Sequence, residues 1–152
     1  MKKLILPIFL ILILISCEKE KIAPIPANCT EKWILVRMTG NFANQPPLVG
    51  ADMDWQESLY FYPNGKFLKS RERNGAIVEA GGTFQITTIS YQKYVELVYD
   101  SENELIATCE AGLKEYLMVN SDSELSGTWM ACDGPGLYYE KLGFICAFNG
   151  DQ

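Results

Sequence analysis

Leu-Tyr-Phe-Tyr-Pro-Asn-Gly-Lys-Phe, at positions 59–67, is the segment that decides the fold, because it predicts a β-hairpin. Its proline fits the second position of a type I turn, and Gly65 fits the left-handed position that closes a three-residue loop. A two-residue turn would place Phe61 opposite Leu68, whereas the three-residue loop places Phe61 opposite Phe67. We favour the three-residue loop, which puts the aromatic side chains on one buried face.

Short segments rich in branched and aromatic residues lie on both sides of this hairpin, separated by turn residues. The strands that we expect are Trp33–Met38, Glu57–Tyr62, a basic strand from Phe67 onward, Thr83–Thr87, Tyr94–Tyr99, Leu105–Cys109, Tyr116–Asn120, Leu125–Ala131 and Tyr138–Ile145. This succession predicts an all-β antiparallel meander that closes into a barrel of eight or nine strands, with an open barrel or a β-sandwich as the alternative. Because a closed antiparallel barrel needs an even number of strands, we expect one segment outside it or an open sheet.

The basic strand carries Lys69, Arg71 and Arg73 at alternate positions, so the three side chains share one face. We interpret them as the part of the strand that leaves the core or reaches a wet rim. A ligand-binding patch is the less favoured interpretation.

The N-terminus has the order of parts that is typical of a secretory signal peptide. Lys2 and Lys3 form a positive start, and Leu4–Ile15 is an apolar run that is too short to span a bilayer of about 30 Å. A serine and then Cys17 follow, and this ending resembles the lipobox of bacterial lipoproteins. The resemblance implies that residues 1–16 are removed and that Cys17 carries diacylglycerol and an acyl chain such as palmitate. An ordinary signal anchor with an incidental cysteine is the alternative.

Residues 17–28 are then expected to form a flexible tether between the lipidated cysteine and a domain at residues 29–152. The charged run Glu18–Lys21 loosely resembles the tag of surface-exported lipoproteins of the Bacteroidetes. The proline-bearing stretch Ile22–Pro26 favours extended chain and would hold the domain roughly 30 Å from the lipid. We expect the protein to lie in the cell envelope, anchored in the outer membrane, on either the periplasmic or the surface face.

The charge of the chain bears on its partners. The sequence has 19 acidic and 13 basic residues, and removal of Lys2 and Lys3 leaves a net charge of −8. An acidic domain is repelled by phosphates, so we expect no nucleic-acid partner. We expect the protein to contact the membrane through the lipid on Cys17 alone.

The cysteine count agrees with a lipidated Cys17, because five cysteines then leave four to pair. An even number outside the cytoplasm indicates two disulfides, with reduced buried thiols as the alternative. In an alternating meander Cys109 and Cys132 lie at one end of the barrel. Cys132 and Cys146 instead flank a strand of roughly 25 Å, which is too long for a bridge. We therefore expect the pairs Cys109–Cys132 and Cys29–Cys146.

Residue types that catalysis commonly uses are missing from the sequence. There is no histidine, which excludes imidazole as base or zinc ligand, and no Cys-x-x-Cys, phosphate loop or Gly-x-Ser-x-Gly motif. We therefore expect no enzymatic activity, no metal site, and no cofactor apart from the covalent lipid at Cys17.

Four short motifs carry a resemblance over nearly the whole domain. They are Trp33-x-Leu35, Leu59-Tyr60-Phe61-x-x-Asn64-Gly65-x-Phe67, Gly82-Thr83-Phe84-x-Ile86 and Gly134-x-x-x-Tyr138-Tyr139-Glu140-Lys141. With them the chain resembles the lipocalin-like lipoproteins that are widespread in Bacteroidetes. The resemblance implies a lipocalin-like barrel and supplies fold rather than activity.

A small barrel either fills its interior with side chains or leaves room for one ligand. We expect a binding module for a small hydrophobic ligand or an envelope protein, and the alternative is a structural or interaction protein with a filled core. The candidate ligand contacts are the large aromatic residues Trp33, Phe61, Phe67, Phe84, Trp55 and Trp129.

The position of a cavity mouth can also be anticipated. Thr39–Gln56 is a long loop for a compact domain, and such loops are often functional. We expect the mouth to lie under this loop, with Phe42, Met53 and Trp55 among the residues that cover it.

Overall fold

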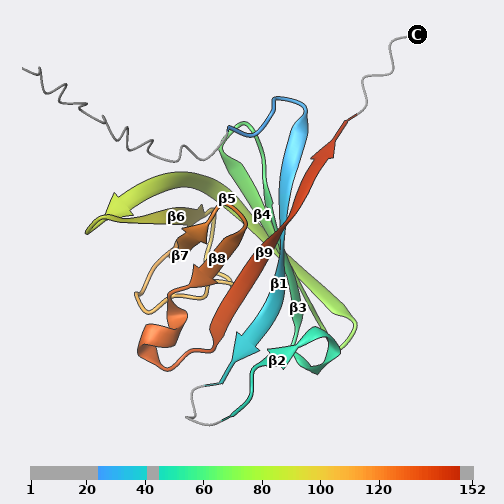
Figure 1. Cartoon of the computed structure of the whole chain (residues 1–152), viewed down its shortest axis with the longest axis vertical. Helices are drawn as coiled ribbons and strands as arrows, with labels where there is room; N and C mark the ends of the chain where they lie inside the picture. The colour runs from blue at the N-terminus through green and yellow to red at the C-terminus, as the bar shows by residue number, and fades with distance from the viewer. Residues whose placement is uncertain (1–23, 41–44, 148–152) are drawn as a thin grey trace, which may run out of the picture.

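The computed structural model of the chain describes residues 24–40 and 45–147. They form a closed antiparallel barrel of eight strands with one additional short strand (Figure 1). In chain order the strands are β1 (Cys29–Thr39), β2 (Leu48–Val49), β3 (Gln56–Phe61), β4 (Lys66–Arg73), β5 (Ala76–Ile89), β6 (Gln92–Tyr99), β7 (Lys114–Ser121), β8 (Glu124–Gly127) and β9 (Gly136–Cys146). Two short 3₁₀ helices, η1 (Gly50–Asp52) and η2 (Trp129–Cys132), complete the elements of the described residues.

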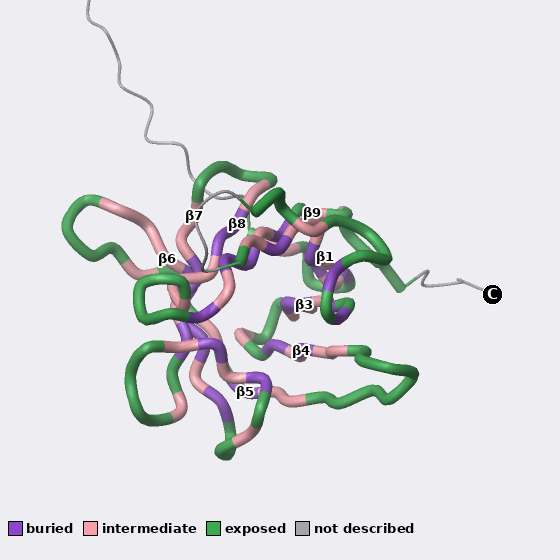
Figure 2. Tube along the Cα trace, turned by 90° about the horizontal axis from the view of Figure 1, so that it is seen from below, coloured by how far each residue is buried: buried purple, intermediate pink, exposed green. Residues whose placement is uncertain are grey.

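The pairing of β1 with β9 closes the sheet, so the open barrel and the sandwich are both excluded. The remaining strands are ordered β1, β3, β4 and so on to β9, which is the expected meander. Figure 2 shows the strands arranged around a common interior, with buried residues alternating with less buried ones along several of them. The extra strand β2 pairs with β1 outside the ring.

The hairpin between β3 and β4 has the expected three-residue loop. Phe61 pairs with Phe67, and the amide of Tyr62 donates to the carbonyl of Lys66 at 2.9 Å. Gly65 has a φ of 78°, the left-handed conformation that glycine adopts without steric cost.

The two ends of the barrel are named here after the first and last residues of β1. The Cys29 end carries the turns between β3 and β4, β5 and β6, and β7 and β8, whereas the Thr39 end carries β2 and η2. A disulfide joins Cys29 to Cys146, the first residue of β1 to the last residue of β9, as expected. It ties the closing pair of strands at the Cys29 end.

The expected strand Leu105–Cys109 is wrong, because buried side chains bind the backbone groups that a strand would pair. Leu105 and Ala107 are fully buried, but their backbone groups bond to side chains. The carbonyl of Leu105 accepts from Lys69 Nζ at 3.0 Å, and the amide of Ala107 donates to Glu115 at 3.3 Å. This segment therefore lies inside the ring as irregular chain, which resolves the odd strand count.

The expected strand Leu125–Ala131 is too long, because β8 ends at Gly127 and the chain turns into η2. η2 ends at Cys132, which forms a disulfide with Cys109. The pairing agrees with the expectation, although Cys109 follows irregular chain rather than a strand.

The signal peptide at residues 1–16, Cys17 and most of the expected tether lie outside the described residues. The chain is described from Pro24, and Ile25 already packs against the core of the barrel. The ordered domain thus begins before Cys29. In the described part of the chain no helix has the length and apolar character to cross a membrane.

Candidate functional site

A cavity of about 360 Å³ opens at the Cys29 end of the barrel. Its walls come from the N-terminal segment and from strands on all sides of the ring. The lining residues used below are Pro24, Ile25, Glu31, Trp33, Phe61, Phe84, Ile86, Val95, Val119, Asp122, Leu125 and Lys141. Most of this surface is aromatic or aliphatic, so the cavity is suited to an apolar occupant.

The aromatic side chains of the cavity wall point inward because side chains alternate along each strand. Glu31 and Trp33 of β1 both point inward, because side chains two positions apart share a face. Phe61 at the end of β3 lies against Phe84 of β5, with ring centroids 4.7 Å apart and a tilt of 57°. Tilted aromatic pairs of this kind are favourable beyond their buried area.

A buried carboxylate, that of Glu31, interrupts the apolar wall and has polar partners. Glu31 accepts from the indole nitrogen of Trp33 at 2.5 Å and pairs with Lys141 at 3.1 Å. The ammonium of Lys141 also lies 5.3 Å from the ring centre of Trp33. The carboxylate and the ammonium neutralise each other, and the other charged lining residue, Asp122, is exposed in the turn between β7 and β8.

The cavity is not under the long loop, so the expected position of the mouth is wrong. The loop is at the Thr39 end, and the cavity opens at the Cys29 end. Met53 and Trp55 are instead buried in the core below the loop, and Phe42 lies outside the described residues. The loop contributes core side chains because β2 holds it against β1.

Three of the six candidate contacts, Trp33, Phe61 and Phe84, line the cavity. The other three do not. Phe67 packs edge-on against Tyr99 at 5.0 Å, Trp55 lies under the guanidinium of Arg71, and Trp129 lies on η2.

Sequence reasoning missed several other lining residues, and alternation offered a signal for some of them. Val119 shares a face with the buried Leu117 of β7, and Leu125 is itself an apolar residue of β8, so an inward face assigned to those strands would have included them. Ile25 was missed because the surrounding prolines indicated an exposed tether.

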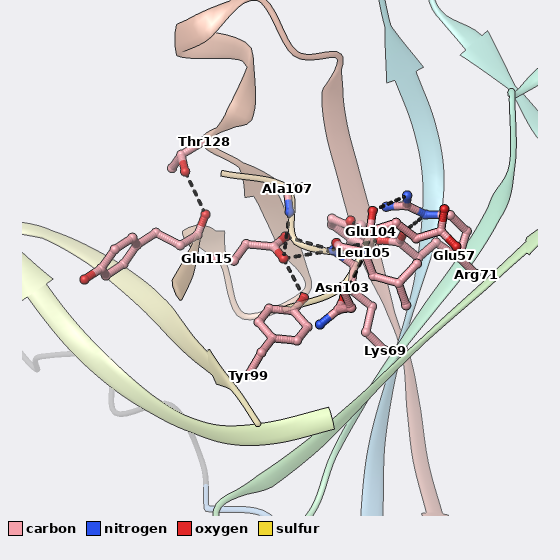
Figure 3. A network of polar contacts seen from close by, with 12 residues as sticks. Glu57, Lys69, Arg71, Tyr99, Asn103, Glu104, Leu105, Ala107, Glu115 and Thr128 are labelled. Carbon is pink, nitrogen blue, oxygen red and sulfur yellow. Dashed lines mark hydrogen bonds and ion pairs between the residues drawn. The ribbon is translucent and has the colours of Figure 1, made fainter. Parts of the chain in front are cut away.

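A buried ionic network occupies the barrel interior on the Thr39 side of the cavity (Figure 3). At its centre the ammonium of Lys69 lies 2.9 Å from Glu115 and 3.2 Å from Glu57, and the side chains of all three are fully buried. Arg71 donates to Glu57 at 2.6 Å. The interpretation of Lys69 as part of a wet rim is therefore wrong, because β4 stays in the barrel wall and its alternation points Lys69 inward.

Two tyrosines complete the network. The hydroxyl of Tyr99 donates to Glu115 at 2.6 Å, and that of Tyr139 donates to Glu57 at 2.5 Å. Burial raises the pKa of Tyr139, and the negative charge of Glu57 raises it further. The opposite holds for Glu57, where burial alone would raise the pKa but Lys69 and Arg71 hold it below its usual value. The carboxylate of Glu57 thus stays ionised, and Tyr139 stays a neutral donor.

Comparisons of the chain with protein-family models, curated proteins and solved structures found no match. Among the residues that the structure describes, no group of three or more histidine, cysteine, aspartate or glutamate side chains could hold a metal ion. The cavity is therefore the feature on which a function can be argued.

Proposed function

We propose that the protein is a lipid-anchored lipoprotein of the cell envelope whose lipocalin-like barrel binds a small apolar ligand. The observation that supports the binding function is the cavity of about 360 Å³ at the Cys29 end. Its volume lies in the range of ligand pockets, about 300–1,000 Å³. The filled ionic half of the barrel gives this cavity a floor.

The lining favours a single slender apolar group rather than a charged compound. Trp33, Phe61, Phe84 and Leu125 carry no charge, and the charges of Glu31 and Lys141 are paired with each other. The remaining carboxylate, that of Asp122, is exposed to solvent. Transfer of a neutral polar group into such a site without a hydrogen bond costs on the order of 2–7 kcal/mol, and transfer of an unpaired charge costs more. Burial of an apolar ligand instead gains about 25 cal/mol per Å².

The neutral fluorescent probe N-phenyl-1-naphthylamine tests this binding. We expect its emission to rise when it enters the cavity of the wild-type protein. Val119→Phe places a larger side chain on the cavity wall and should weaken binding about tenfold, which corresponds to about 1.4 kcal/mol.

The matched control is Met118→Phe, one position earlier on β7, where the side chain alternates to the opposite face. It should bind the probe as the wild type does. Equal probe affinity in both variants, or no binding by any of the three proteins, would contradict a ligand in the cavity and favour an interaction protein.

The anchor is the second part of the proposal and rests on the sequence around Cys17. Metabolic labelling of the expressing bacterium with an alkyne-bearing palmitate should label the wild-type chain and not Cys17→Ser. The double variant Cys109→Ser/Cys132→Ser should retain the label, because those thiols are joined in a disulfide. Label that persists in Cys17→Ser would refute lipidation at this position.

A further inference from the structure

The hairpin between β5 and β6 carries an apolar tip at the Cys29 end, reaching out from the barrel (Figure 1). Tyr91 in its turn is fully exposed, and Ile89 next to the turn is 47 % exposed. Ile86, on the opposite, cavity-facing side of β5, is 46 % exposed. Single exposed apolar residues are ordinary, and the opposite hairpin also exposes Ile77 and Val78, so the β5–β6 tip is distinguished by its turn and its charge.

The turn of this hairpin is chemically unusual. Ser90 and Tyr91 have φ angles of 48° and 70°, so both central residues are left-handed. Such turns favour Asn-Gly, and the hairpin between β4 and β5 has that pair, Asn74-Gly75, in the same conformation. A tyrosine in the strained position adds nothing to folding that asparagine or glycine would not, which points to a role for the exposed ring.

The β5–β6 and β4–β5 hairpins also differ in the number of charged residues near their turns. The segment Phe84–Gln92 contains no acidic or basic residue, although the whole chain is acidic. The segment Arg71–Glu79 around the other turn contains two arginines and two glutamates. The β5–β6 tip can therefore approach a lipid headgroup layer without the repulsion that an acidic surface would meet.

The tip lies beside the cavity mouth and beside the point where the described chain begins. Ile86 lines the cavity, as do Pro24 and Ile25. Pro24 is seven positions after Cys17, and a chain of that length spans at most about 25 Å. A lipid on Cys17 would thus keep this end of the barrel, and not the Thr39 end, close to the bilayer.

We propose that the β5–β6 tip, formed by Ile86, Ile89 and Tyr91, rests in the interface of a lipid bilayer. A tyrosine ring with an apolar body and a polar hydroxyl suits this depth, and the hairpin enters tip first with Ile89 on its outer face and Ile86 on the face toward the cavity mouth. The cavity mouth then faces the membrane, so an apolar ligand passes between bilayer and barrel without crossing water. The nearness of this end to the membrane rests on the proposed anchor.

The experiment compares two full-length variants, Tyr91→Trp and Ile77→Trp, each bound to phosphatidylcholine vesicles with brominated acyl chains. Ile77 is 66 % exposed and flanks the turn of the opposite hairpin, so it is a matched control. We expect the emission of the tryptophan at position 91 to shift to the blue and to be quenched by bromine. The tryptophan at position 77 should show neither change beyond the wild-type signal.

Equal quenching at the two positions, or none at position 91, would refute membrane contact by the β5–β6 tip. The tip would then be assigned to a protein partner. Intact mass of the same samples reports lipidation separately. An unlipidated protein would refute the anchor, while quenching at position 91 after mixing with vesicles would still support the surface. Probe binding in the cavity, measured as above, fails or succeeds independently of both results.

Discussion

Replacement of Lys69 by methionine is expected to lower the free energy of unfolding by about 3–5 kcal/mol. The ammonium is fully buried and contacts Glu57 and Glu115, and it also donates to the carbonyl of Leu105. Methionine has a similar length but leaves the second carboxylate without a cation, since Arg71 reaches Glu57 alone. Urea unfolding followed by circular dichroism measures the loss.

The pH dependence of this loss distinguishes lost charge from lost packing. The pKa of Glu57 is lowered in the folded wild type from 4.5, so its stabilisation is present above pH 4.5 and is lost as the pH falls through the folded value. In Lys69→Met the Glu57 carboxylate gains less from ionisation, and the difference in unfolding free energy from wild type should narrow below pH 4.5. A pH-independent difference would contradict the ionic explanation. Lys66→Met, on the exposed start of β4, should change stability by less than about 0.5 kcal/mol.

Loss of the Cys29–Cys146 disulfide has the second large expected effect. The bond closes 117 residues of sequence, whereas Cys109–Cys132 closes 23. The chain-entropy model gives about 4.9 kcal/mol for the longer loop and about 3.4 kcal/mol for the shorter one. We expect the double serine variant at positions 29 and 146 to be the less stable of the two.

The matched comparison is the double variant Cys109→Ser/Cys132→Ser, unfolded in urea under the same non-reducing conditions. The reverse order of stability would mean that native contacts around Cys109, and not chain entropy, dominate. Wild-type protein with a reductant should lose both contributions, and no change on reduction would contradict a stabilising role for either bond.

Local signals predicted the wall of the barrel well. The turn at Asn64-Gly65 fixed the register of Phe61 and Phe67, and alternation located the strands that pair with neighbours in the chain. The two disulfides also followed from topology, because strand direction decides which cysteines share an end.

The interior could not be predicted in the same way. Lys69 appears in a basic alternating run, and only the assembled barrel shows that Glu57 and Glu115, which are 58 positions apart, converge on it. Leu105–Cys109 has the composition of a strand, but its backbone groups form hydrogen bonds with the side chains of the network and not with a neighbouring strand. The cavity lies at the opposite end from the long loop for the same reason, since these buried charges fill the half that the loop covers.

The bond between Cys29 and Cys146 also decides how the domain responds to a pull on its N-terminus. Tension that arrives at Asn28 reaches β1 and β9 together, because their ends are covalently joined. Without the bond, the same force would open the β1–β9 ladder one hydrogen-bonded pair at a time, beginning beside the cavity mouth. The crosslink carries that load in place of the first hydrogen bonds of the ladder, so a barrel held at one end by its chain keeps its binding chamber closed under load.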